Sequence, residues 1–408
     1  MEGLFSTLLK YRDLLPASRD ARVLIKPNLN SNMNALTGNT TDLRVLSAVI
    51  QFLLAQGYRD ITVGEGTNSG FYRNRISVIS RLRVDELARH YGVKVKDLNY
   101  AEPYDIPFEK GVVAQAARDC VDADFLVSIP KLKTHFEVGM SVCLKNLMGC
   151  MIGQPNKKKT HEDLPGNILR INRAIRPHLH IVDGLVAMEG LGPTRGTPLR
   201  MDMLVVGTDP YLIDLVCASV AGMDYRRVRT LERAEREGLL TADHHRALQA
   251  LDLAPWRREF RQPKPGIIAG FIHSSKRQRF FQRIRSTPFF TYLASTRWFG
   301  QLLFISGLRQ DKFMQEDMGG IRLAIDLDLC DQCNACRQVC PLGMDVPRHV
   351  ADGTIPCVQC LYCYSVCPRH AIRVEGDLGF FREQLRQYDA LIRRLYAPAA
   401  AAAPQAGV

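Results

Sequence analysis

The sequence predicts an α/β protein with an open, mostly parallel sheet and helices on both faces, followed by a small α+β domain rich in cysteine. Two observations support this prediction. Strand-like and helix-like segments alternate along residues 1–263, which is the pattern of an open parallel sheet. In addition, eight of the twelve cysteines lie between Cys330 and Cys367.

The elements of the larger domain are predicted from hydrophobic period and from end signals. Short apolar runs indicate strands, and apolar residues at helical spacing indicate helices. Thr41 is the expected N-cap of the first helix, and Gly57 follows the end of that helix. The expected strands are Val23–Lys26, Asp60–Val63, Val93–Leu98, Asp124–Ile129, His180–Val182 and Met203–Val206, and the expected helices are Asp42–Ala55, Arg75–His90 and Asp209–Ala221.

Composition divides the chain into four predicted parts. Its 408 residues are 46% hydrophobic, which is enough for a large core. We expect an α/β domain at 1–263, a basic aromatic connector at 264–320, the cysteine-rich domain at 321–378, and a helical, then disordered tail at 379–408. There is no secretory start and no apolar run of about 18 residues, so we expect a cytoplasmic protein without a membrane-spanning helix.

The cysteine-rich segment contains two copies of one motif, C-x2-C-x2-C-x3-C-P, and each cysteine of the second copy lies 27 residues after its counterpart. This is the ligand pattern of bacterial two-cluster ferredoxins, in which the fourth cysteine of each run binds the other cluster. We therefore expect a ferredoxin-like domain with two 4Fe–4S clusters. Cys330, Cys333, Cys336 and Cys367 would bind cluster 1, and Cys357, Cys360, Cys363 and Cys340 would bind cluster 2.

Two other interpretations of these cysteines were weighed. A pair of four-cysteine zinc sites is disfavoured, because zinc ribbons use separated C-x2-C pairs. The clusters could also be purely structural. Two clusters in series are more than a structural staple needs, and their potentials are tunable, so electron transfer is favoured.

Polar residues follow the predicted strands of the larger domain, where an open α/β sheet binds its ligands. Several are lysines, and together with the net charge of +12 they suit an anionic partner. We expect His135, Glu65 and Lys145 to be catalytic, with His135 the first choice as proton donor. The expected substrate-binding residues are Lys26, Asn28, Lys131, Lys133, Asn146, His161, Asp183 and Arg195.

Some of these residues have a second interpretation. His135 and His161 could bind a metal with Glu65 or Asp183, but no short ligand spacing links them, so hydrogen bonding is favoured. The run Lys157–Lys159 is interpreted as solvated surface charge.

Glycines and isolated cysteines also have more than one interpretation. Gly64, Gly66 and Gly70 follow a strand, but their spacing departs from a dinucleotide fingerprint and no helix is expected at Phe71–Arg73. Four isolated cysteines lie outside the repeats. Cys120 and Cys217 are interpreted as buried hydrophobic residues, whereas Cys143 and Cys150 flank Lys145 and could have a redox role.

Residues 276–309 combine lysine, arginine and aromatic residues without any acidic residue. One interpretation is an amphipathic element on an anionic membrane surface. Packing of the aromatic residues on the larger domain is slightly favoured. No nucleic-acid-binding module is recognisable, so no nucleic acid partner is expected.

The larger domain resembles the family called domain of unknown function 362, which is often fused to a ferredoxin module. The resemblance covers roughly residues 20–225. It rests on Lys26-Pro27-Asn28, Thr41-Asp42, Gly64-Glu65-Gly66, Pro130–His135, Lys145-Asn146 with Gly149, Lys159 with His161, Asp183-Gly184, Glu189–Gly196, Asp209 and Asp214.

These features favour an iron–sulfur oxidoreductase. A ferredoxin or a similar donor would supply low-potential electrons, and the α/β domain would bind an anionic organic substrate and reduce it, for example at a polarised double bond. One alternative is a non-catalytic electron-transfer or iron–sulfur carrier protein that serves a partner enzyme. The other is a non-redox enzyme with structural clusters.

Overall fold

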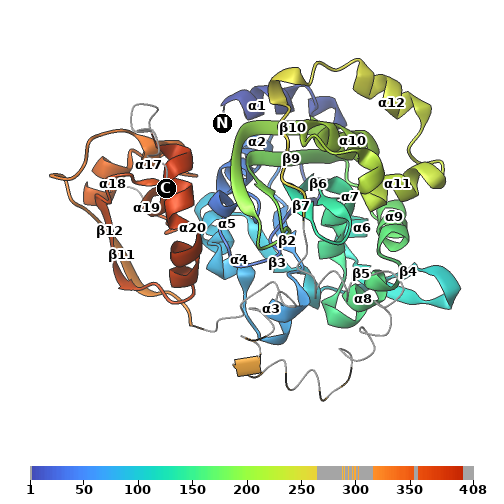
Figure 1. Ribbon diagram of the computed structural model, residues 1–408, viewed down its shortest axis with the longest axis horizontal. Helices are drawn as coiled ribbons and strands as arrows, with labels where there is room; N and C mark the ends of the chain where they lie inside the picture. Colours follow the sequence, from blue (N-terminus) through green and yellow to red (C-terminus); the bar gives the residue numbers. More distant parts are fainter. Residues whose placement is uncertain are drawn as a thin grey trace, which may run out of the picture.

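The computed structural model describes residues 2–263, 316–352 and 357–397, and the single positions 287, 289, 293, 296, 298, 299 and 302. Most of the basic aromatic connector predicted at 264–320, including most of residues 276–309, and the end of the predicted tail lie outside the described residues. Figure 1 shows the α/β domain, coloured blue to yellow, beside a smaller unit in orange and red. We call this smaller unit, from β11 to α20, the C-terminal module.

The α/β domain is built on one eight-stranded sheet with the order β3-β2-β1-β6-β9-β7-β8, in which β10 pairs with β9. The pairs among β3, β2, β1, β6, β9 and β7 are parallel, whereas β8 and β10 are antiparallel. The predicted mostly parallel sheet is therefore confirmed. Its strands are β1 (Val23–Pro27), β2 (Ile61–Glu65), β3 (Lys94–Asp97), β6 (Phe125–Ile129), β7 (Lys131–His135), β8 (Gly139–Ser141), β9 (Leu179–Glu189) and β10 (Thr197–Gly207).

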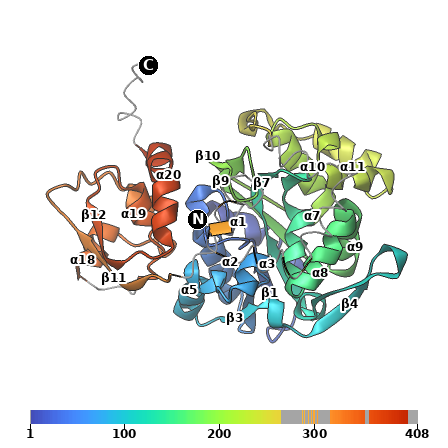
Figure 2. The same ribbon diagram turned by 60° about the horizontal axis from the view of Figure 1, so that its bottom comes forward.

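Helices and one hairpin cover the two faces of this sheet (Figures 1 and 2). The hairpin consists of β4 (Pro103–Pro107) and β5 (Val113–Ala117). The helices are α1 (Glu2–Leu9), α2 (Leu43–Ala55), α3 (Ser69–Arg73), α4 (Val78–Arg81), α5 (Val84–Tyr91), α6 (Asp119–Asp122), α7 (Cys143–Asn146), α8 (Gly153–Thr160), α9 (Leu164–Ala174), α10 (Pro210–Val220), α11 (Arg229–Arg236) and α12 (Ala242–Gln249).

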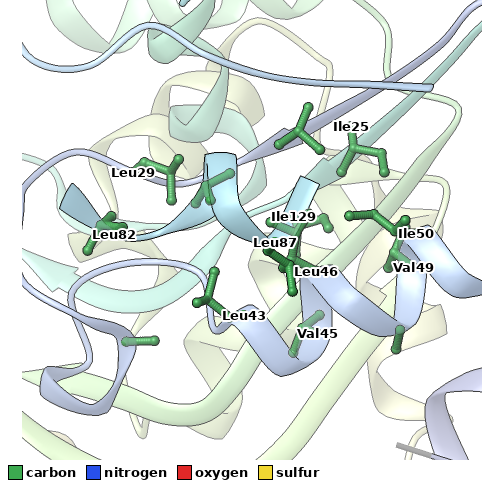
Figure 3. Packing of buried hydrophobic residues seen from close by; sticks show 14 of the residues in the cluster. Ile25, Leu29, Leu43, Val45, Leu46, Val49, Ile50, Leu82, Leu87 and Ile129 are labelled. Carbon is green, nitrogen blue, oxygen red and sulfur yellow. The ribbon is translucent and has the colours of Figure 1, made fainter. Parts of the chain in front are cut away.

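The central strands are apolar on both sides because successive side chains of a strand point to opposite faces of the sheet. Ile25 of β1 packs with Leu46 and Val49 of α2 on one face (Figure 3). Leu24 of β1 and Leu126 of β6 join a second core with the β4–β5 hairpin on the other face. Burial on both faces therefore fixes the position of the strand ends that carry the polar residues.

The start of α2 differs from the prediction. Asp42, not Thr41, is the N-cap, and its side chain accepts the N–H of Arg44. The Thr41 hydroxyl is used elsewhere, because it accepts the N–H of Asn28 and donates to the carbonyl of Ile129. Thr41 thus ties the end of β1 to the end of β6.

The predicted helix at Arg75–His90 was also wrong. The segment forms α4 and α5, which are separated by Arg83 in the left-handed conformation with φ of +61°. A left-handed residue interrupts a right-handed helix, and side-chain periodicity does not reveal it. Upstream, the unexpected short helix α3 begins behind Asn68, whose side chain accepts the N–H of Gly70.

The C-terminal module consists of β11 (Gly319–Ile325), α17 (Ala335–Val339), α18 (Val346–Asp352), α19 (Tyr362–Val366), β12 (Ile372–Asp377) and α20 (Phe381–Tyr396). Its two strands pair antiparallel. Helix α20 lies between these strands and the α/β domain (Figures 1 and 2). Buried residues of α19 and α20, including Tyr362, Val366, Tyr388 and Ile392, belong to the same apolar core as α2, so an apolar interface joins the module to the domain.

The predicted domain boundaries at 263, 320 and 378 stay predictions. In the described part of the chain, no helix is both long enough and apolar enough to cross a membrane.

Replacing Leu46 by alanine tests this core. Leu46 is buried between α2 and the sheet, so Leu46→Ala should lower the free energy of unfolding by about 2–5 kcal/mol. The measurement is chemical denaturation of the full chain. Leu14→Ala is the control, because Leu14 is 42% exposed and its loss should cost less than about 0.5 kcal/mol. Equal losses in both variants would contradict the packing described above.

Candidate functional site

The polar residues gather at the carboxyl edge of the sheet, where the strand order reverses. Strand β1 pairs with β2 on one side and with β6 on the other, and ligands of open α/β sheets bind outside such a switch point. Asn146 of α7 lies over it. Its amide group donates to Ser128 Oγ (3.0 Å), and its Oδ1 accepts from Asn28 (3.0 Å) and Lys26 (3.4 Å).

Lys26 and Glu65 form a buried ion pair at this point. The Lys26 ammonium lies 3.0 and 2.9 Å from the two carboxylate oxygens, and the N–H of Leu29 donates to Glu65 Oε2. Charges of both signs are costly to bury unless they are paired and hydrogen-bonded. The predicted roles of Lys26 in substrate binding and of Glu65 in catalysis stay predictions, but in this structure each of the two groups has a fixed partner.

Gly149 makes this pair possible. A Cβ at this position would lie 1.9 Å from Glu65 Oε1 and 2.6 Å from Lys26 Nζ. The carbonyl of Gly149 also accepts the N–H of Gly66, just after β2. The backbone of the Lys145–Gly149 segment therefore covers the ion pair directly.

A second buried pair joins Lys131 of β7 to Asp183 of β9 at 2.9 Å. The same carboxylate oxygen accepts the backbone N–H of Asp42 at 2.7 Å, and the other oxygen accepts the N–H of Leu185. Burial would raise the pKa of Asp42, but Arg44 and Lys131 outweigh it, so this pKa is lowered. The second pair thus fixes the start of α2 to the sheet.

Lys133 organises the loop that follows β1. Its ammonium donates to Asn28 Oδ1 (2.8 Å), Asn30 Oδ1 (2.5 Å) and the carbonyl of Asn39 (2.7 Å). The roles of Asn30 and Asn39 were not predicted. The alternation of asparagine at positions 28 and 30 behind a strand was the available signal for the first of them.

Lys157 corrects the prediction that the run at 157–159 is solvated. Its side chain is buried and donates to the carbonyls of Gly66 and Thr67 and to Asn99 Oδ1. Burial lowers the pKa of Lys157 to about 8. Lys158 is exposed, as predicted, and the Lys159 ammonium donates to the carbonyl of Val113.

His135, Glu137, Lys145 and His161 form a further polar group beside the switch point. His135 Nδ1 accepts the N–H of Glu137 at 3.1 Å, which leaves the proton of the neutral ring on Nε2. Burial and the charge of Lys145 lower the pKa of His135 well below its ordinary value, against the effect of Glu137. Glu137 Oε2 lies 3.4 Å from His161 Nδ1. Sequence reasoning missed Glu137, although it stands two residues after His135.

Lys145 differs from the other predicted lysines. It is half-buried, and within the described part of the chain its ammonium makes no hydrogen bond. Burial lowers the pKa of Lys145 to about 8, and the charge of Glu137 opposes this. Near neutral pH such a group can both attract an anion and donate a proton.

Asp214 holds the helix that carries Lys145. Its carboxylate accepts the N–H groups of Cys143 and Leu144 at the start of α7, and burial raises its pKa to about 7. Cys217, as expected, is fully buried. Asp214 therefore positions α7, which was not predicted from the sequence.

Arg195 belongs to the loop between β9 and β10. Its charge acts on Tyr388 of α20, whose hydroxyl donates to the carbonyl of Gly196 at 3.1 Å. The predicted substrate-binding role of Arg195 stays a prediction, but its loop contacts the C-terminal module.

The eight cysteines of the module form two groups of interacting thiols, and their roles as cluster ligands stay predictions. The thiol of Cys336 interacts electrostatically with Cys330, Cys333 and Cys367. The thiols of Cys360 and Cys363 interact in the same way with Cys357 and Cys340. The fourth cysteine of each run thus lies with the other run.

The backbone around these thiols also fits iron–sulfur clusters. Gln332 and Asn334 in the first run and Gln359 and Leu361 in the second have φ between +53° and +60°. These strained conformations stand at equivalent positions of the two repeats and turn backbone N–H groups toward a shared centre. For example, the N–H of Gln359 donates to Cys357 Sγ at 3.3 Å. Among the described residues, no three His, Cys, Asp or Glu side chains are grouped as ligands of a single ion.

Comparison with protein families agrees with this geometry. The model of the family described as domain of unknown function (DUF362) matches residues 23–219, and that of the 4Fe-4S dicluster domain matches residues 322–369. The second match indicates a domain that carries iron–sulfur clusters and supports electron transfer. The predicted fusion of the two families is confirmed.

Individual relatives are more distant. A thylakoid-associated protein of Synechocystis sp. is 29% identical over 233 residues, which are 53% of this chain and 68% of the relative. Two solved structures are similar over about half of their own length. Lactate racemase apoprotein from Thermoanaerobacterium thermosaccharolyticum has a TM-score of 0.36 at 13% identity and covers 52% of this chain and 51% of its own. A Thermotoga maritima protein has a TM-score of 0.33 at 16% identity and covers 54% and 58%.

Gly149→Ala tests the covering of the Lys26–Glu65 pair. The added methyl group must displace buried charges, so the free energy of unfolding should fall by at least about 1–3 kcal/mol. Gly3→Ala is the control, since a Cβ there meets no atom within 4 Å. Thermal and urea denaturation of both variants measure the difference. A neutral Gly149→Ala variant would show that the loop does not press on the ion pair.

Competitive amine acylation at a series of pH values tests the state of Lys145. The lysine reacts only as the neutral amine, so its labelling should be half-maximal near the lowered pKa of about 8. The same peptide in urea should titrate near the ordinary lysine pKa of about 10.4. Glu137→Gln should lower the midpoint further, because Glu137 raises this pKa. Identical midpoints in folded and unfolded protein would refute the assignment.

Proposed function

Because residues 23–219 form a DUF362 domain and residues 322–369 form a 4Fe-4S dicluster domain, we propose that this protein is an iron–sulfur oxidoreductase. The clusters, when bound by the eight cysteines, supply one-electron transfer at low potential. The substrate would be an anionic organic molecule at the switch point of the α/β sheet, and the electron donor a ferredoxin or a similar protein. The observation that carries the proposal is the packing of the C-terminal module on the start of α2, whose first residues belong to the polar network at the strand ends.

In this proposal Lys145 receives the substrate. Its ammonium is the cation of the predicted site without a hydrogen bond in the described part of the chain, so an incoming carboxylate or phosphate can take that place. Asn146 and Asp214 hold α7 in position. The buried pairs Lys26–Glu65 and Lys131–Asp183 supply fixed dipoles around the bound molecule and exclude water.

Lys145 is also the favoured proton source. Reduction of a polarised double bond consumes two electrons and two protons, and the electrons would arrive singly from the protein donor. Lys145, with its pKa near 8, can give one proton at neutral pH, and water can give the second. Neutral His135 is a weaker acid, and its Nε2–H is suited to hydrogen-bond the substrate.

A peripheral location at a membrane is proposed as a separate point. The composition of residues 276–309 and the thylakoid association of one relative support it.

An anaerobic reoxidation assay tests the proposed function. The full chain with both clusters is reduced and then mixed with a panel of α,β-unsaturated carboxylates, and cluster absorbance and paramagnetic resonance are followed. Reoxidation by one of these acids, with formation of the saturated product, is the expected result. Lys145→Gln should slow product formation by about 10²-fold or more.

Lys94→Gln is the matched control. Lys94 is the first residue of β3, so it lies at the amino end of the strand and not at the carboxyl edge that carries the site, and it pairs with Asp60. It should leave the rate unchanged. If only a protein fraction from the same cells reoxidised the clusters, the protein would be an electron carrier instead. If turnover continued with the clusters held oxidised, it would be a non-redox enzyme.

A further inference from the structure

The two halves of the C-terminal module are related by the 27-residue repeat and both contact α2, but among the described residues only the second half hydrogen-bonds the start of this helix through a side chain of its cysteine loop. Tyr362 stands between Cys360 and Cys363, and its hydroxyl oxygen accepts the backbone N–H of Leu43 at 3.4 Å. The equivalent residue of the first repeat is Ala335, which has no side chain that could make this contact. Tyr362 therefore breaks the symmetry of the module at the interface.

The contact of Tyr362 supplies an acceptor for a backbone N–H group that has none within its own helix. Leu43 is the first residue of α2, and the N–H groups in the first turn of a helix have no acceptor within the helix. Asp42 satisfies the next N–H, that of Arg44, through its side chain. The module thus completes the cap of α2, and the positive end of this 13-residue helix points at the loop that carries Cys360 and Cys363.

Three consecutive residues connect this contact to the site. Leu43 meets Tyr362, the N–H of Asp42 meets Asp183, and Thr41 meets Asn28. Asp183 in turn holds Lys131, and Asn28 holds Asn146. The path from the loop of Cys360 to the switch point is therefore continuous and buried.

A second contact acts on the same half of the module. Arg83, between α4 and α5, is a cation of the α/β domain whose charge acts on the Cys357 thiol. The cysteines of the other set interact with one another and with Asp331 of the module itself. Arg44 does reach the first repeat, where it donates to the carbonyl of Gln338, but Asp42 neutralises its charge.

We propose that the cluster site formed by Cys340, Cys357, Cys360 and Cys363 is the one coupled to the α/β domain, with Tyr362 as the junction and Arg83 as its tuning charge. The site of Cys330, Cys333, Cys336 and Cys367 is then the outer one, available to the protein donor. The direction of electron flow between the two cluster sites rests on the proposed function. The assignment of one site as outer and the other as coupled to the α/β domain does not.

Redox titration followed by paramagnetic resonance tests the order on the full chain with both clusters. Cys360→Ser and Cys333→Ser each weaken one signal and so assign the two signals to the two sites. Arg83→Gln should lower the midpoint potential of the signal that depends on Cys360, because a nearby cation favours the more negative reduced state. The signal that depends on Cys333 should not move, and Arg83→Lys should restore the potential.

Arg337→Gln is the matched control in the first repeat, where Arg337 follows Cys336 directly. Arg337→Gln should lower the midpoint potential of the signal that depends on Cys333. If Arg83→Gln moved the signal that depends on Cys333, or moved both signals equally, the proposed order would be overturned. A correct order together with no reoxidation by any organic acid would refute the proposed function alone.

Amide hydrogen exchange tests the junction without any redox readout. Tyr362→Phe keeps the ring in the core but removes the acceptor of the Leu43 N–H, so exchange in the peptide that begins α2 should accelerate several-fold. Tyr364→Phe is the control, because Tyr364 faces Arg393 within the module. Unchanged exchange in Tyr362→Phe would show that Tyr362 is not the junction. The order of the two cluster sites would then be decided by the midpoint potentials of the Arg83 variants.

Discussion

The start of α2 is the constraint on which the rest of the structure depends. Three successive residues there are satisfied by three different parts of the chain, namely the loop after β1, strand β9 and the C-terminal module. A helix start needs outside acceptors for its first N–H groups, and a buried start cannot take them from water. Placing α2 correctly therefore requires the sheet edge and the module to be in place together. This links the iron–sulfur part of the molecule to the candidate site through the backbone.

Each buried lysine of the site is likewise held by oxygen atoms of other residues. Lys26 and Lys131 each face one carboxylate, whereas Lys133 and Lys157 are held by amide and backbone oxygens. Buried ion pairs contribute little net stability compared with apolar packing, so four buried ammonium groups at one edge are better explained by what they hold in place. They fix the loops after β1 and β2 around the switch point. Lys145 differs from these four lysines, because its ammonium makes no hydrogen bond with the described residues.

The sequence predicted those features that depend on local spacing and failed where three-dimensional packing decides. The crossed cysteine sets and the strand ends followed from repeats and hydrophobic runs. The break at Arg83 did not, because a left-handed residue leaves the apolar period of Arg75–His90 intact. Lys157 was misjudged for a similar reason: a run of three lysines looks solvated, but the first of them faces inward to the carbonyls after β2. The contacts of Glu137 with His161 and of Asp214 with the start of α7 join residues far apart in the sequence, so no local pattern indicated them.

Electrons and protons would reach the site on different elements, and this separation has a physical use. The module contacts the start of α2, where Asp183 and Lys131 form a buried ion pair. The proposed proton source, Lys145, lies on α7, whose first N–H groups donate to Asp214. A negative charge that develops on the bound substrate would raise the pKa of the nearby ammonium and hold the proton until the bond to the substrate is ready to form. The ammonium groups of Lys26 and Lys131 each already face a carboxylate of the protein. Lys145, which makes no hydrogen bond with the described residues, is thus the part of the proposed site that would respond to reduction.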